Sequence, residues 1–320
     1  MIDSTKLGLD NESHFSKGNL VQGSSKRFPP SFHKLAAEKM SANLIEFVGK
    51  VDLVITSPPY HNAISYESHA IDPSQNFRAR SELDYGVDYL PFLNKVWDEC
   101  WTLLRPGGIL CVNVGSVLDE GLHYPLPQDI SNQITNNRKK KWVYQRTFVW
   151  HKVTGGVKRA GSVIAKPFPG YWYPNIMTEH IMIFSKGASL KVCNNNNELP
   201  KSWDQPVWDI APVPSRLIEH PAPFPEEIPH RLIRMYSPQG GLVLDPFNGS
   251  GSTTKAAFDL GRHSIGLDIQ TTYLELARNR IGTATLIREM QLELGVLPRS
   301  MFVPGPSQGR TRHGSGKGKN

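Results

Sequence analysis

Two patterns of hydrophobic positions follow one another along this chain. One is a short continuous apolar run, and the other is a longer stretch in which apolar residues recur at helical spacing. The runs predict buried strands at 51–56, 109–114, 242–245 and 264–268. The helical spacing predicts helices at 31–48, 89–104, 126–137, 225–236, 271–281 and 285–294. Residues 143–150 and 179–185 alternate like an antiparallel pair of strands. Strands interleaved with helices in this way predict an α/β fold.

The first predicted strand ends in an unusual turn. Ser57 is followed by Pro58 and Pro59, which lack a backbone N–H and cannot continue a ladder, so the chain turns away at the carboxyl end of the strand. Open α/β sheets bind their ligands at that edge. The free carbonyls, the Ser57 hydroxyl and the ring of Tyr60 suit a planar group that carries an exocyclic amine. A Pro-Pro turn with a surface tyrosine is the alternative interpretation.

A second strand, 242–245, leads into a glycine-rich turn. The strand ends in Asp245, and Gly249 and Gly251 let the backbone approach a ligand closely before a helix with free N–H groups begins. About twenty residues later another strand ends in Asp268, where nucleotide-binding folds place an acid on the ribose hydroxyls. The order of these elements favours a nucleotide-like cofactor over an ordinary strand-turn-helix unit.

Together the two stretches resemble the β-class amino-methyltransferases of DNA. Residues 56–60 read Thr-Ser-Pro-Pro-Tyr and residues 245–252 read Asp-Pro-Phe-Asn-Gly-Ser-Gly-Ser, similar to the family's catalytic motif followed by its S-adenosyl-L-methionine motif. Further matches lie at 83–89, 104–115, 179–186 and 220–225. The resemblance spans roughly residues 50–285 and implies the class I methyltransferase fold. That fold is a doubly wound, mostly parallel sheet with one antiparallel strand, here with the motifs in circularly permuted order.

The resemblance also implies roles for individual residues. Those expected to be catalytic are Ser57, Pro58, Pro59 and Tyr60. Those expected to bind S-adenosyl-L-methionine are Asp245, Pro246, Phe247, Gly249, Ser250, Gly251, Asp268, Pro223 and Phe224. No metal is expected. One family feature is missing, because the stretch before the catalytic strand does not resemble the short strand ending in an acid that commonly stands there. Glu38 and Glu46 are the acids of that stretch, and neither is assigned.

The implied reaction is methyl transfer to an exocyclic amine. Ser57 and the Pro58 carbonyl would accept the amine's N–H groups, and Tyr60 would stack on a base flipped out of the duplex. A C5-cytosine mechanism needs a cysteine nucleophile, typically after a proline, and none of the cysteines at 100, 111 and 193 follows one. In this family serine at the first motif position is associated mostly with cytosine N4 and aspartate with adenine N6. Cytosine N4 is therefore the expected target and adenine N6 the alternative.

The net charge of +7 and the pI near 9.2 favour a polyanionic partner, here double-stranded DNA. Basic and aromatic residues are interleaved over 152–175, which suits phosphates and unstacked bases. Residues 61–87 form a long irregular segment, interpreted as either a functional loop or a solvated flap. The expected organisation is a flexible arm at 1–28, a methyltransferase domain at 29–303 and a basic disordered tail at 304–320. Within the domain we expect a catalytic half at about 50–186, target-recognition insertions at about 152–175 and 187–216, and a cofactor half at about 220–295.

Two other functions stay open at this point, a catalytically silent DNA-binding protein and a small-molecule methyltransferase. A restriction endonuclease acting on the same site is a candidate companion, not necessarily in physical contact. No apolar run approaches membrane-spanning length, and the amino-terminal residues lack the features of a signal peptide. No membrane partner is expected, and the cytoplasm is the default location.

Overall fold

The computed structural model describes residues 27–59, 84–119, 122–153, 176–187, 199–203, 205–213 and 225–293. Residues 1–282 form one compact unit and residues 283–320 a second one. The sheet and the site described below belong to the first unit. Residues 1–26 of the predicted arm, the basic tail, most of the two target-recognition insertions and the 61–83 part of the long irregular segment lie outside the described residues.

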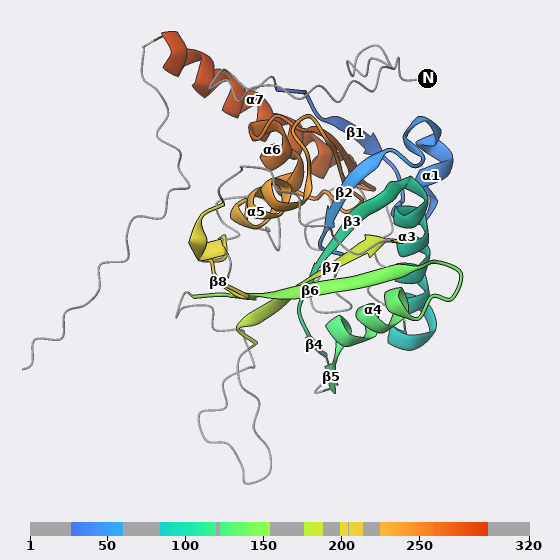
Figure 1. Cartoon of the computed structure of the whole chain (residues 1–320). Coiled ribbons are helices and arrows are strands. Elements are labelled where there is room, and N and C mark those ends of the chain that lie inside the picture. The colour runs from blue at the N-terminus through green and yellow to red at the C-terminus, as the bar shows by residue number, and fades with distance from the viewer. Residues whose placement is uncertain are drawn as a thin grey trace, which may run out of the picture. The chain divides into compact units, whose positions relative to one another are not determined.

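An eight-stranded sheet forms the centre of the first unit (Figure 1). Its strands, in spatial order, are β1 (Ser31–Lys34), β10 (His263–Asp268), β9 (Leu242–Asp245), β2 (Val51–Thr56), β3 (Leu104–Val114), β7 (Thr178–Lys186), β6 (Trp142–His151) and β8 (Val207–Asp209). Strand β7 runs antiparallel to both of its neighbours, and every other pair is parallel. This arrangement confirms the predicted mostly parallel sheet with one antiparallel strand.

Helices cover both faces of the sheet, as expected for strands with near-continuous apolar sequences. On one face lie α1 (Met40–Asn43), α3 (Leu90–Leu103) and α4 (Leu126–Thr135), and on the other α5 (Glu227–Tyr236) and α6 (Ser252–Asp259) (Figure 1). The helix α7 (Thr271–Glu293) follows β10. Each face therefore has its own hydrophobic core.

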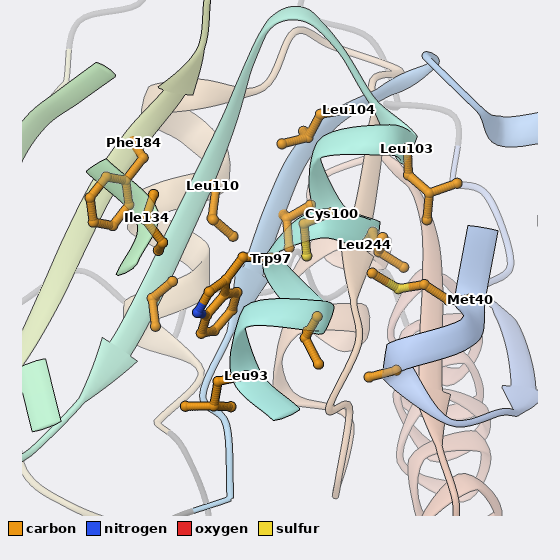
Figure 2. Packing of buried hydrophobic residues seen from close by; sticks show 14 of the residues in the cluster. Met40, Leu93, Trp97, Cys100, Leu103, Leu104, Leu110, Ile134, Phe184 and Leu244 are labelled. Carbon is orange, nitrogen blue, oxygen red and sulfur yellow. The ribbon is translucent and has the colours of Figure 1, made fainter. Parts of the chain in front are cut away.

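The core under α3 fixes the position of the central strands. Figure 2 shows Leu93, Trp97 and Cys100 projecting from α3 toward β2 and β3. All three are almost completely buried, together with Leu110 of β3 and Leu244 of β9. Truncating a buried tryptophan to alanine typically costs about 3–5 kcal/mol. This packing therefore holds the central strands in place, and the ends of β2 and β9 carry the candidate site.

Several elements differ from the sequence-based expectation. The helix predicted at 31–48 is wrong at its start, because Ser31–Lys34 is an edge strand in parallel register with β10. Only short helical turns follow, at Ala37–Lys39, Met40–Asn43 and Ile45–Phe47. The two helices predicted at 271–281 and 285–294 are one continuous helix, α7. The small hairpin of β4 (Val117–Asp119) and β5 (Leu122–Tyr124) and the strand β8 were not predicted. The other predicted helices and strands are confirmed to within a few residues.

Candidate active site

Two predicted motifs that lie far apart in the sequence meet at one edge of the sheet. Strands β2 and β9 are parallel neighbours, with Val54 opposite Leu244, so both end at the same edge. Asp52 reinforces the pairing, since its Oδ2 accepts a hydrogen bond of 2.8 Å from the N–H of Leu242, 190 residues away. We call Ser57–Pro59 the Pro-Pro turn and residues 245–251 the glycine turn. The predicted residues Tyr60, Pro223 and Phe224 lie outside the described residues.

The glycine turn is held by hydrogen bonds within the turn and to the nearby strand β10. Asp245 Oδ1 accepts from the N–H of Phe247 at 3.0 Å, and the N–H of Asn248 donates to the Leu267 carbonyl at 2.8 Å. The N–H of Gly251 donates back to the Asn248 carbonyl at 2.8 Å. The turn is therefore tied directly to the neighbouring strand β10.

Gly251 occupies a position that only glycine fits well. Its φ of +82° lies in the left-handed region, and a Cβ added there would lie 2.6 Å from the Cβ of Ala277 on α7. The sequence suggested that this glycine lets a ligand approach the backbone. In the structure the close neighbour is a helix, so the requirement for glycine arises from backbone conformation and packing. Arg280, one turn further along α7, donates to the Ser250 carbonyl.

Asp245 is almost completely buried at the end of β9, with 5% of its surface exposed. Burial raises the pKa of Asp245 to about 6. The Thr253 hydroxyl, the Phe247 N–H and the Thr56 hydroxyl offset part of that rise, and the nearby charge of Asp268 adds to it. The carboxylate at the end of β9 is therefore costly to ionise without a ligand.

Asp268 ends β10 and faces the glycine turn. Its Oδ2 accepts from the N–H of Gly249 at 3.0 Å and its Oδ1 from the N–H of Gln270 at 2.9 Å. Burial raises the pKa of Asp268 to about 6, offset in part by backbone N–H groups. Each carboxylate oxygen keeps acceptor capacity for a further hydrogen bond. Among the described residues neither Asp268 nor Asp245 forms a salt bridge.

The other predicted residues of this turn complete the same edge. Pro246 is buried, and Phe247 is half-buried with its ring packed edge-on against Phe92 of α3, 6.1 Å between centroids. Of the acids considered for the missing family position, Glu38 is half-buried four residues after β1 ends, whereas Glu46 is exposed. Strand β1 thus supplies the strand that sequence did not reveal, but it ends in Lys34 rather than in an acid.

A tyrosine outside the predicted motif holds the Pro-Pro turn. The Tyr89 hydroxyl donates to the Pro59 carbonyl at 2.7 Å, and Tyr89 is only 2% exposed. Tyr89 ends a single π-helical turn, Tyr85–Tyr89, which Asp84 caps by accepting from the N–H groups of Gly86 and Val87. Such turns occur frequently at functional sites. The sequence placed Tyr89 in a family match without a role, and its contact with Pro59 becomes visible only in the structure.

Other kinds of site are not found in the described parts of the chain. They contain no group of three or more His, Cys, Asp or Glu residues that could hold a metal ion. Within the same residues no helix is both long and apolar enough to cross a membrane.

The relatives of this chain decide its family. Residues 51–279 match the family model of DNA methylases. This chain belongs to that DNA methylase family. It is 30% identical over 262 residues to the type II methyltransferase M.MjaI of Methanocaldococcus jannaschii, an alignment covering 72% of this chain and 85% of that protein. It is 28% identical over 274 residues to M.MthZI of Methanothermobacter thermautotrophicus, covering 76% of this chain and 75% of that protein.

Solved structures agree with the family assignment. TTHA0409 of Thermus thermophilus, described as a DNA modification methylase and complexed with S-adenosyl-L-methionine, is 28% identical with a TM-score of 0.55 over 80% of this chain and 95% of its own. The cytosine-N4-specific PvuII methyltransferase is 18% identical with a TM-score of 0.61, covering 83% of this chain and 94% of its own, and supports the fold alone. The predicted family and the class I methyltransferase fold are thereby confirmed.

Proposed function

We propose that this DNA methylase transfers a methyl group from S-adenosyl-L-methionine to N4 of a cytosine flipped out of double-stranded DNA. One observation carries the proposal: β2 and β9 are parallel neighbours, so the Pro-Pro turn and the glycine turn start from the same edge of the sheet. N6 of adenine is the alternative target, because the same two acceptors would hold either amine. The names of the type II relatives favour a role in restriction and modification.

The glycine turn and the two acids fit the cofactor. A buried carboxylate with a raised pKa and no salt bridge within the described residues favours a ligand that brings positive charge or hydroxyl donors. Asp268 would accept from the ribose hydroxyls, and the backbone of the glycine turn would hold the amino-acid part. When bound, S-adenosyl-L-methionine supplies an electrophilic methyl group on a sulfonium.

The Pro-Pro turn would activate the amine. An aromatic amine is a weak nucleophile because its lone pair is delocalised into the ring. Two acceptors directed at its N–H groups, the Ser57 hydroxyl and the Pro58 carbonyl, return electron density to the nitrogen. The Tyr89 hydroxyl donates to the Pro59 carbonyl and so helps to hold the turn that presents the Pro58 carbonyl. Fixing the amine in line with the methyl group supplies the orientation that direct transfer needs.

Tyr60 is the expected stacking platform for the flipped base, and the positive net charge of +7 favours binding to the DNA backbone. A base inside the duplex cannot present its amine to a site at a sheet edge. The target must therefore leave the stack before transfer.

The test is methyl transfer from labelled cofactor to DNA, followed by digestion to nucleosides and mass analysis. N4-methylcytosine is the expected product. If N6-methyladenine is the only product, the target is adenine rather than cytosine, and the protein is still a DNA methyltransferase. DNA binding without any transfer would identify a silent binding protein, and transfer that does not require DNA would point to a small-molecule substrate. Ser57→Ala and Tyr60→Ala should lower transfer while leaving cofactor affinity unchanged.

A further inference from the structure

Three polar side chains are buried together at the carboxyl end of β3, beside the Pro-Pro turn. Asn113 comes from β3, Glu179 from the start of β7 and Lys152 from the position just after β6, and they are 2%, 5% and 8% exposed. Asn113 Nδ2 donates to Glu179 Oε2 at 2.6 Å, and Lys152 Nζ donates to Glu179 Oε1 at 2.5 Å. We call these three residues the Asn113 network. The sequence motifs gave no role to Asn113 or Glu179, whereas Lys152 belongs to the stretch 152–175 that was expected to contact nucleic acid and is instead paired with Glu179 in the structure.

One hydrogen-bond acceptor of this network receives no hydrogen bond from any of the described residues. Asn113 Oδ1 is buried and forms no hydrogen bond there. The bond from Asn113 Nδ2 to the Glu179 carboxylate, which only accepts, fixes the orientation of the amide and leaves Oδ1 as an acceptor. A buried acceptor without a partner is costly, and such groups in native proteins call for an explanation.

The sheet register places this acceptor next to Ser57. Thr56, the last residue of β2, is opposite Val112 in the β2–β3 pair, and continuing this register by one residue brings Ser57 opposite Asn113. Ile55 and Cys111, two residues earlier on each strand, belong to the same core cluster, and strand alternation puts Ser57 and Asn113 on that face. Pro58 restricts Ser57 to extended backbone, which maintains the alternation. Neighbouring strands lie about 4.8 Å apart, within reach of a serine and an asparagine side chain.

The proposed role of Ser57 requires an acceptor for its own hydroxyl proton, and Asn113 Oδ1 can be that acceptor. A hydroxyl that accepts an N–H from the target amine must direct its own proton elsewhere, because otherwise that proton points at the group it should attract. We propose that Asn113 Oδ1 accepts the Ser57 hydroxyl proton when the amine is bound, which turns a Ser57 lone pair toward the amine. Asn113 is then a positioning residue, and the inference rests on the proposed function. Glu179, held by Lys152, polarises the Asn113 amide so that its Oδ1 is a stronger acceptor. No covalent step is added to the transfer.

The test is a double-mutant cycle between Asn113 and Ser57, read as single-turnover methyl transfer to DNA. Asn113→Leu in the otherwise native protein should lower the rate about tenfold, the value of one hydrogen bond of about 1.4 kcal/mol. In a Ser57→Ala background, Asn113→Leu should lower the remaining rate less than about twofold, because the Ser57 hydroxyl that Asn113 would accept from is already absent. Cofactor affinity should be unchanged by Asn113→Leu.

Equal losses in both backgrounds, or no loss in the native background, would overturn the role of Asn113. If Asn113→Leu does not fold, Asn113→Ala takes its place: it removes the amide oxygen with less crowding and leaves Glu179 paired with Lys152. The same pattern of losses is expected. The native protein is assayed first, and failure of methyl transfer there would count against the proposed function rather than against Asn113.

Ser185 provides the matched control. It lies on β7 six residues after Glu179, is 1% exposed and accepts from Gln145 Nε2 at 2.6 Å. Ser185→Ala removes a buried polar contact from the opposite end of the same strand, β7. It should lower the temperature of unfolding but leave the transfer rate unchanged. A rate loss as large as that of Asn113→Leu would show general weakening of the sheet and would contradict the proposal.

Discussion

The glycine turn and the Pro-Pro turn lie at the same edge of the sheet but are held in opposite ways. The glycine turn is held through its own backbone groups, since Asp245 accepts from the N–H of Phe247, Asp268 accepts from the N–H of Gly249 and Arg280 donates to the Ser250 carbonyl. In the Pro-Pro turn the prolines have no N–H to offer, and Tyr89 contributes a hydrogen bond from outside, to the Pro59 carbonyl. Changes in the glycine turn should therefore act on stability and cofactor affinity, and changes around the Pro-Pro turn on rate.

The largest expected effect comes from the buried ion pair beside the Pro-Pro turn. Lys152→Met leaves Glu179 buried without its cation and should cost about 3–5 kcal/mol of unfolding free energy, measured by urea denaturation. The control is Lys140→Met, which breaks a pair whose Asp98 side chain is 41% exposed and should cost at most about 1 kcal/mol. Similar losses in the two variants would show that the Asn113 network is not held by a tight buried pair.

Gly251→Ala tests the local rigidity of the glycine turn. Positive φ and the clash with Ala277 together should cost about 3 kcal/mol and weaken cofactor binding, followed by thermal unfolding and cofactor titration. Gly240→Ala is the matched control, because Gly240 also has a positive φ of +70° but no atom within 4 Å of the added Cβ. It should cost about 1 kcal/mol and leave cofactor affinity unchanged. Equal effects would mean that backbone strain alone, without packing on α7, explains the glycine.

The acids at the ends of β9 and β10 predict a pH dependence with opposite signs for stability and for cofactor binding. The folded-state pKa values of Asp245 and Asp268 are raised to about 6 from 3.8, so the stability they contribute is present below about pH 4 and is lost as pH rises to about 6. A cationic cofactor prefers the ionised acids, so its affinity should rise about tenfold per acid between about pH 5 and pH 7. Calorimetric titration of the cofactor across this pH range measures the change in affinity. Asp268→Asn should make the affinity depend less on pH. An affinity that is constant across this range would exclude these acids as contacts of the cofactor.

Tyr89→Phe tests whether the Pro-Pro turn is positioned from outside. Loss of the hydroxyl frees the Pro59 carbonyl, and the single-turnover transfer rate should fall about tenfold while cofactor affinity stays the same. Tyr85→Phe is the control, because Tyr85 lies in the same helical turn but donates to Asp129 at 2.7 Å, away from the Pro-Pro turn. It should affect stability only. A rate loss of equal size in both variants would assign the effect to the helical turn as a whole.

Much of the fold could be predicted because its signals are local. The apolar runs of β2, β3, β9 and β10 and the helical spacing of α3 and α5 identify themselves without partners. Strand β1 could not be predicted, since Ser31–Lys34 has no strong strand pattern and forms its ladder only against β10. The continuity of α7 through Gly282 was missed for a related reason, because one glycine costs only about 1 kcal/mol in a helix.

By itself the sequence determined where the strands of the site end, since proline cannot extend a ladder and a glycine at positive φ fits a turn. It also contained both motifs on which the family assignment rests. Only the tertiary structure decided that these ends meet, that Tyr89 reaches the Pro59 carbonyl, and that Asn113, Lys152 and Glu179 are buried together. The physical reason is that each of these contacts joins segments distant in the chain, so it depends on sheet order and register rather than on local preference.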